Sequence, residues 1–370
     1  MNRITTVQIE GFKSIRHLER LEIGPVNLLI GPNGAGKSNF IGFFQFLSHI
    51  ASENLQRYVQ IHGFADSFLH LGSKITSRIR GELEFGGEEE TIRYGLSLIP
   101  AAGDTLVFAE ECLSSCGNGN PEPIEFDMEA GGKESALVNS SNVFSDREHI
   151  HAAQDVRDVL SRKRVYQFHD TTPESRLRKA APVDDHRFLR PDGGNLPAVL
   201  FGMRRNRPEF YRRIVLQLRR MIRGFRDFEL APEGDYILLR WRGSDPDYTF
   251  GPHQISDGSL RLMALSTLFL QPPEALPNMI IVDEPELGLH PEAEALLAGM
   301  IRGVSSRCQV LLATQSASFV DHFEADDVVV CDMEDSASRF RRLSRTELDG
   351  WLEDYTLGEV WRKNAIGGLP

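Results

Sequence analysis

The chain contains several short apolar runs that stop abruptly at polar residues, which is the pattern of buried strands followed by loops. Residues 26–30, 279–282 and 310–313 are of this kind. Residues 3–10 instead alternate apolar and polar side chains, which indicates a strand with one buried face. The sequence therefore predicts strands near both ends of the chain.

The middle of the chain carries two other patterns. Strand-like runs cover residues 77–85, 90–98 and 105–112, whereas helical spacing is found at 148–162 and 208–223. The segment that follows residue 38 has apolar side chains on more than one side of a helix, so it is predicted to be deeply buried. Its phenylalanines, expected in the core, are Phe40, Phe43, Phe44 and Phe46.

Composition narrows the class of protein. The chain has 370 residues, 41% of them hydrophobic, and a formal net charge of −12, which argues against a protein coated for nucleic acid. No apolar run approaches the ~20 residues that span a bilayer, and the N-terminus lacks the apolar segment of a signal peptide. The four cysteines lack the spacing of a zinc site, and we expect them to be reduced thiols in a cytoplasmic protein.

The strongest chemical signal is the segment Gly31–Ser38, which has the P-loop pattern and follows an apolar strand directly. Glycines let the backbone N–H groups curl around phosphate oxygens, and a helix beginning near Lys37 adds the positive end of its dipole. Lys37 is expected to reach the β and γ phosphates, and the Ser38 hydroxyl to ligate Mg²⁺. The candidate nucleotide-binding residues of this segment are Asn33, Gly34, Ala35, Gly36, Lys37, Ser38 and Asn39. The alternative is a glycine loop without a ligand.

A second signal is the apolar strand before Asp283 and Glu284. A carboxylate at the end of a buried strand beside a P-loop can hold Mg²⁺, usually through water, which we assign to Asp283. Glu284 is then placed to orient or deprotonate the attacking water. The alternative is a strand end that carries two acidic residues with no catalytic role.

The order of these motifs resembles an ABC-type ATPase, and the closest resemblance is to the compact SMC-, RecF- and OLD-like proteins often described as AAA-type ATP-binding proteins. Ser256–Ser259 looks like a variant of the ABC signature motif, in which Ser256 and Gly258 would present a hydroxyl and N–H groups to phosphate. Leu287–Pro291 is similar to the D-loop, which makes His290 a candidate nucleotide contact.

Two further segments extend the resemblance. Residues 310–316 are similar to the switch segment, where Gln315 stands at the position that usually carries histidine. Glutamine cannot take up a proton, but it can donate a hydrogen bond, so Gln315 joins Glu284 as a catalytic candidate. Residues 11–14 are similar to the N-terminal element of SMC- and RecF-type ATPases, which would place Lys13 near the nucleotide.

The resemblance implies an α/β fold, namely the ABC-type ATPase head, a P-loop NTPase with a mixed sheet, an antiparallel β portion and a helical insertion forming a lid or short arm. It divides the chain into residues 1–146 and 227–345 as the two halves of the head, 147–226 as the insertion, and 346–370 as a helical tail. It also implies ATP and Mg²⁺ as ligands. In this family, ATP joins two subunits head to tail between the P-loop of one and the signature segment of the other.

The expected function is therefore ATP hydrolysis in a homodimer that ATP closes, gating a DNA-related or anti-phage process. A separate effector protein (a nuclease or toxin) and DNA are the possible partners, and no membrane is involved. The alternatives are an ATP-dependent scaffold with little hydrolysis and a transporter ATPase subunit. An arginine-rich stretch at 204–226 either faces phosphate or is a solvated helix face that pairs with acidic side chains.

Overall fold

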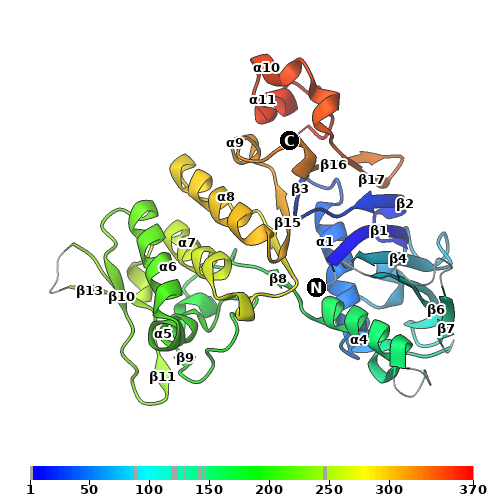
Figure 1. The fold of residues 1–370 in the computed structure, drawn as a ribbon, viewed down its shortest axis with the longest axis horizontal. Helices are drawn as coiled ribbons and strands as arrows, with labels where there is room; N and C mark the ends of the chain where they lie inside the picture. The colour runs from blue at the N-terminus through cyan, green and yellow to red at the C-terminus, as the bar shows by residue number, and fades with distance from the viewer. Residues whose placement is uncertain are drawn as a thin grey trace. The chain divides into compact units, whose positions relative to one another are not determined.

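The computed structural model describes residues 3–86, 90–117, 124–128, 131–140, 144, 147–244 and 248–369 (Figure 1). The chain divides into two compact units. Unit 1 comprises Met1–Lys163 and Glu324–Pro370, and unit 2 comprises Arg164–Phe323. Each unit contains both strands and helices, as expected for an α/β protein.

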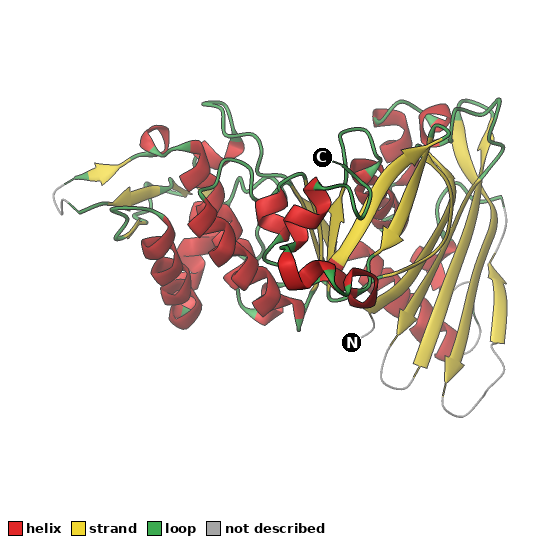
Figure 2. Cartoon of the chain, turned by 90° about the horizontal axis from the view of Figure 1, so that it is seen from above, coloured by secondary structure: helices red, strands yellow, loops and turns green. Residues whose placement is uncertain are grey.

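Unit 1 contains a six-stranded antiparallel sheet in the order β2-β1-β4-β5-β6-β7, whose long strands can be followed in Figure 2. This sheet is the predicted antiparallel β portion. Its strands are β1 (Arg3–Phe12), β2 (Ile15–Glu22), β4 (Ile79–Gly86), β5 (Glu90–Ala101), β6 (Thr105–Gly117) and β7 (Ile124–Met128).

The strand that leads into the P-loop belongs to a second set of strands in unit 1. β3 (Val26–Ile30) runs parallel to β16 (Val328–Glu334), which pairs antiparallel with β17 (Ala337–Arg342), so the strands are mixed in direction. All five residues of β3 are buried, as its apolar composition predicts. The helices of unit 1 are α1 (Lys37–Ile50), α2 (Leu55–Ile61), α4 (Arg147–Ser161), α10 (Trp351–Asp354) and α11 (Leu357–Arg362), with 3₁₀ turns at Ala65–Phe68, Ala136–Asn139, Ala325–Asp327 and Arg345–Leu348.

The core of unit 1 is built on the phenylalanines of α1, all of which are fully buried as predicted. Phe12 of β1 reaches the same cluster, with its ring centroid 5.3 Å from that of Phe43 and 5.5 Å from that of Phe46. Buried aromatic rings contribute most of the apolar area in such a core. The helix that begins inside the P-loop is therefore fixed to the sheet by its own side chains.

Unit 2 contains the strand before Asp283 and the strand before Gln315. β14 (Met279–Asp283) and β15 (Gln309–Thr314) are parallel neighbours with Asp283 opposite Ala313, and α8 (Pro291–Ser305) connects them. The other helices are α5 (Leu196–Asn206), α6 (Pro208–Met221), α7 (Asp257–Leu270) and α9 (Ala317–Val320), with 3₁₀ turns at Arg176–Arg178, Pro252–Gln254 and Pro273–Ala275. The remaining strands are β8 (Lys163–Tyr166), which begins at the end of unit 1, β9 (Ala181–Pro182), β10 (Asp227–Glu229), β11 (Tyr236–Ile237), β12 (Arg240–Arg242) and β13 (Thr249–Phe250).

Helix α7 packs against α6 and α8, and α5 packs against α6. Within the described ranges, no helix combines the length and the apolar composition needed to cross a bilayer.

Candidate nucleotide-binding site

The P-loop of unit 1 has the backbone conformation that its glycines predict, with positive φ angles. Gly31, Gly34 and Gly36 all have positive φ, at 151°, 83° and 102°. A Cβ at Gly31 would lie 2.2 Å from the Cys331 carbonyl oxygen, and one at Gly36 would lie 2.0 Å from the Ser338 hydroxyl. Gly31 and Gly36 therefore require glycine for space as well as for conformation. Asn33 and Gly34 at the tip are exposed, and Ala35 is buried.

Lys37 begins α1, and only 6% of its surface is exposed. Its ammonium group donates hydrogen bonds to the carbonyl oxygens of Gly31 (2.6 Å) and Pro32 (3.0 Å), so its charge lies on the inner side of the loop. Ser38 follows in the first turn of α1 and is exposed. The predicted phosphate-binding role requires one cation at this place, together with backbone N–H groups of the loop.

Two serines that the sequence reading did not identify also contact this loop. Ser14 Oγ accepts hydrogen bonds from Asn39 Nδ2 and from Ser338 Oγ, each at 2.7 Å, and the Ser338 N–H donates to the Ser14 carbonyl oxygen at 2.7 Å. Gly36 lies against both hydroxyls. These contacts join the start of α1 to the turn after β1 and to β17, which lie far apart in the sequence.

Lys13 lies in the β1–β2 turn with a positive φ of 48°. Its Nζ lies 5.6 Å from the centroid of the Phe12 ring and 5.3 Å from that of Phe68, and burial lowers the pKa of this ammonium group. The described contacts of Nζ are thus with aromatic rings. Its neighbour Ser14 is the residue of this turn that contacts the P-loop network.

The two catalytic candidates are brought together in unit 2. Asp283 and Glu284 are half-buried at the end of β14, and the Glu284 N–H donates to the Ala313 carbonyl oxygen of β15 at 2.8 Å. Gln315 follows β15, and its Nε2 donates a hydrogen bond to Glu284 Oε1. The amide thus fixes one oxygen of the carboxylate that was predicted to activate water.

The signature segment and the D-loop also meet in unit 2. Ser256 is the N-cap of α7, and its Oγ accepts from the Ser259 N–H at 3.2 Å. A Cβ at Gly258 would lie 2.7 Å from the Gly288 carbonyl oxygen, so the two segments are in close contact. His290 is exposed and caps α8, with Nδ1 accepting from the Glu292 N–H at 3.4 Å.

Two arginines form hydrogen bonds that fix the start of α7. Neither was predicted as a functional residue from the sequence. Arg178, which is buried, donates to Asp257 Oδ1 at 2.8 Å and to the Ile255 carbonyl oxygen at 3.1 Å. Arg261 donates to the Leu287 carbonyl oxygen at 2.8 Å, which ties α7 to the D-loop. A guanidinium can bridge several acceptors at once because it carries five N–H donors.

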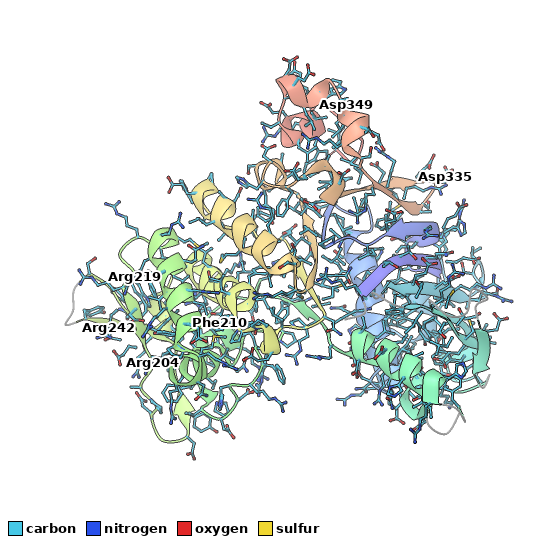
Figure 3. All side chains as sticks on the ribbon, viewed as in Figure 1. Arg204, Phe210, Arg219, Arg242, Asp335 and Asp349 are labelled. Atoms are coloured by element: carbon cyan, nitrogen blue, oxygen red, sulfur yellow. The ribbon has the colours of Figure 1, made fainter. Side chains whose placement is uncertain are left out.

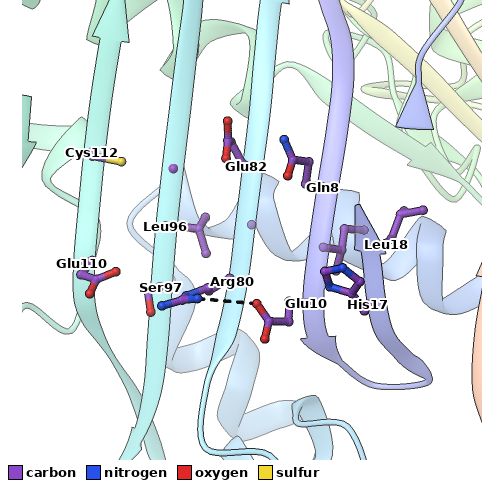
Figure 4. Close-up of a pocket in the computed structure, with 13 residues that line it drawn as sticks. Gln8, Glu10, His17, Leu18, Arg80, Glu82, Leu96, Ser97, Glu110 and Cys112 are labelled. Atoms are coloured by element: carbon purple, nitrogen blue, oxygen red, sulfur yellow. Dashed lines mark ion pairs between the residues drawn. The ribbon is translucent and has the colours of Figure 1, made fainter. Parts of the chain in front are cut away.

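A groove of about 300 Å³ crosses the antiparallel sheet of unit 1 (Figure 4). Its lining includes Glu10, Arg80, Glu82, Glu110 and Cys112, and an Arg80 Nη1 lies 3.8 Å from Glu10 Oε2. None of the predicted nucleotide-binding or catalytic residues lines it. The groove is therefore separate from the candidate site.

Comparison with known proteins agrees with this fold. A solved structure described as "Crystal structure of the SmcHead bound to the C-winged helix domain of ScpA" has a TM-score of 0.59 and 15% identity, covering 94% of this chain and 99% of that one. A second, the Smc head domain with an extended coiled coil bound to the C-terminal domain of ScpA from Pyrococcus furiosus, has a TM-score of 0.58 and 13% identity, with 96% and 99% coverage. At identities this low, the likeness shows the fold alone. These two structures confirm the predicted ATPase-head fold.

The comparison with curated proteins found no match. One family model matches residues 26–321, which include both the P-loop and Gln315. Because this match covers most of the chain, the protein belongs to the family described as "AAA domain, putative AbiEii toxin, Type IV TA system".

Proposed function

We propose that the protein binds and hydrolyses ATP. The observation that carries this proposal is the hydrogen bond between the two candidate catalytic residues in unit 2, where the Gln315 amide donates to the Glu284 carboxylate at the end of β14. A carboxylate held in this way can orient water and accept its proton. In unit 1, Lys37 and the N–H groups of the P-loop are the groups that would stabilise the charge on the transferred phosphoryl group.

Mg²⁺ fits the donors that the chain offers. The Ser38 hydroxyl and the Asp283 carboxylate are each hard oxygen donors of the kind that this ion prefers, and a bound ion would neutralise charge on the phosphates. Ser38 lies in the first turn of α1, and Asp283 at the carboxyl end of a buried strand.

We further propose that the nucleotide is bound between two copies. Within unit 2, the signature segment at the start of α7 is held against the D-loop through Gly258 and Arg261. The two segments are thus neighbours, and in this proposal they would together contact the nucleotide on a partner's P-loop. ATP would then stabilise the closed homodimer, and hydrolysis would release it.

The family description supports a role in defence. It names a putative toxin of a toxin–antitoxin system. We propose that closure of the dimer gates such a response in the cytoplasm, with a separate effector protein carrying the toxic or nucleolytic activity.

The test is ATP turnover in three proteins: the wild type, Glu284→Gln and Lys37→Ala. We expect the glutamine variant to bind ATP but to lose about 100-fold or more in kcat, because the base is removed. The Lys37→Ala variant should lose ATP affinity. A wild-type turnover rate in Glu284→Gln would refute the catalytic assignment, and tight ATP binding by Lys37→Ala would refute the role of the P-loop.

An arginine surface in unit 2 favours nucleic acid as a second ligand. Helix α6 buries Tyr211, Ile214, Val215 and Leu218, and exposes four arginines on its other side. These are Arg212, Arg213, Arg219 and Arg220, of which Arg219 is labelled in Figure 3. Of the nine arginines at 204–226, Arg207 alone forms an ion pair with a carboxylate among the described residues, that of Glu274. With respect to the described carboxylates, the other arginines thus keep charge available for phosphate.

Salt-dependent DNA binding tests this second role. We expect Arg212→Ala and Arg219→Ala each to weaken binding of a duplex and to reduce the slope of log affinity against log salt by about one. Arg207→Ala is the matched control, because its guanidinium is already paired with the Glu274 carboxylate. If all three variants bind DNA equally, this surface is a solvated helix face.

The alternatives make different predictions. A scaffold that uses ATP only to dimerise would show no measurable turnover although it closes on ATP. A transporter subunit would require a membrane partner, for which no described surface provides an argument.

A further inference from the structure

Glu286 lies two residues beyond the proposed catalytic base and is almost completely buried, with 6% of its surface exposed. Its Oε1 accepts a hydrogen bond from the Thr314 hydroxyl, while its Oε2 has no donor among the described residues. A buried carboxylate oxygen without a donor destabilises a fold. Stability therefore does not explain a glutamate at this position.

The backbone directs Glu286 back toward β15. Glu284 has a positive φ of 42°, which turns the chain sharply after β14. The Glu284 N–H is fixed to Ala313 of β15 at 2.8 Å, so the turn begins at a defined place. A non-glycine residue in this conformation is strained, and such strain is concentrated at functional sites.

Thr314 joins Glu286 to the catalytic pair. The threonine hydroxyl donates its single hydrogen to Glu286 and accepts from the Ser316 N–H at 2.9 Å. Residues on both sides of Gln315 are thereby held by one hydroxyl, whose direction Glu286 sets. Gln315 in turn donates to Glu284.

We propose that Glu286 is a positioning residue for ATP hydrolysis, which acts through the Thr314 hydroxyl to keep the Gln315 amide on the Glu284 carboxylate. This rests on the proposed function. Without the hydrogen bond between Glu286 and Thr314, the Thr314 side chain can rotate away from the Ser316 N–H. Gln315 is then held less firmly, and Glu284 loses the donor that fixes its orientation toward water. Burial also raises the pKa of Glu286 to about 7, which marks an environment built around this carboxyl.

The test compares variants that keep the hydrogen bond with variants that remove it. Glu286→Gln and Thr314→Ser retain an acceptor and a hydroxyl, whereas Glu286→Met and Thr314→Val are similar in size and lack them. We expect kcat to fall about tenfold or more in the Met and Val variants and to stay near the wild type in the other two, with ATP affinity unchanged in all four. The split between kcat and ATP affinity separates positioning from general damage to the fold.

A second measurement asks whether the effect passes through Gln315. In a Gln315→Ala background, Thr314→Val should lower kcat no further, because the amide that Thr314 holds is already gone. Glu111→Gln is the matched control for loss of a buried carboxylate. Glu111 of β6 accepts from Tyr94 of β5 and from Ser135, which precedes the 3₁₀ turn at Ala136–Asn139, and its replacement should leave kcat unchanged.

Wild-type kcat in both Glu286→Met and Thr314→Val would overturn the proposal, as would an undiminished effect of Thr314→Val in the Gln315→Ala background. These results leave the proposed function intact if Glu284→Gln still abolishes turnover. Wild-type turnover in Glu284→Gln would instead refute the proposed function itself.

Discussion

The ammonium group of Lys37 lies on carbonyl oxygens of its own loop rather than in solvent. A buried cation keeps its charge only when oxygen atoms surround it. When phosphate binds to the loop, its oxygens can replace the two carbonyl contacts without exposing the charge. The residue is thus already at the place where the β and γ phosphates are expected, and little side-chain reorganisation is needed.

Glu286 makes the stability of the protein depend on pH. Burial raises the pKa of its carboxyl from 4.5 to about 7, and the carboxylates of Glu284 and Glu294 add to the increase. The folded state therefore binds the proton more tightly than the unfolded state, and stability is lost as pH rises through about 7.

We predict that Glu286→Gln removes this loss, because the amide does not titrate. Between about pH 6 and about pH 8, the free energy of unfolding of the wild type should fall by about 1 kcal/mol relative to that of the variant. Urea unfolding at the two pH values measures this difference. Parallel pH dependence of the two proteins would show that Glu286 is ionised throughout this range.

At the scale of elements, the contact between α7 and the D-loop depends on a missing side chain. A methyl group at Gly258 would lie 2.7 Å from the Gly288 carbonyl oxygen, closer than a real contact allows. Two glycines of α8, Gly299 and Gly303, show the opposite case, because a Cβ at either meets no atom within 4 Å. These positions provide a matched pair of glycine substitutions.

We predict that Gly258→Ala separates the signature segment from the D-loop and lowers turnover about tenfold or more, at a cost of about 1–3 kcal/mol in stability. ATP binding by the P-loop should persist. Gly299→Ala should raise stability by about 1 kcal/mol, because alanine favours the helix and has room there. The measurements are ATP turnover and thermal unfolding of both variants. Normal turnover in Gly258→Ala would show that hydrolysis does not depend on the contact between the two segments.

The elements that could be predicted are those whose sequence pattern lies within a few consecutive residues. The strand at residues 26–30, the helix after it and its buried phenylalanines follow from apolar spacing and from the P-loop pattern, and the structure has all of them. The contact of Ser338 with Ser14 was not predictable, because it joins residues 324 positions apart. A hydroxyl pair carries no spacing signal, so only the pairing of strands reveals it.

The contacts of the charged side chains could not be predicted either, because they also join residues far apart in the sequence. The sequence shows that residues 204–226 are rich in arginine. Whether acidic groups pair with these arginines depends on which residues fold beside α6. Buried Arg178 gave no signal either, since its partners Asp257 and Ile255 lie about 80 residues further along the chain. The sequence names candidate chemistry, and tertiary contacts decide which groups remain available for a ligand.

At the scale of the whole molecule, the proposed site requires two copies. Each copy carries one P-loop and one signature segment, and in a head-to-tail dimer these serve different nucleotides. In this proposal, Lys37 and Glu284 of one copy would act on the same ATP, whereas Gly258 would act on the ATP of the other copy. This assignment can be tested by mixing two variants, each of which is strongly impaired when it is alone.

We predict that Lys37→Ala and Gly258→Ala restore each other. A mixed dimer has one site in which both residues are intact, because the P-loop comes from one copy and the signature segment from the other. With random pairing, turnover should return to about a quarter of the wild-type rate, since half of the dimers are mixed and each holds one complete site. Turnover of a 1:1 mixture with ATP and Mg²⁺ measures this.

The control is a mixture of Lys37→Ala with Glu284→Gln. In the head-to-tail arrangement these two residues belong to the same site, so every site in every dimer carries at least one defect and turnover should stay absent. Restoration in this control would mean that the P-loop and the catalytic carboxylate come from different copies. Failure of the first mixture, with dimers confirmed by light scattering, would mean that each chain hydrolyses ATP on its own surfaces.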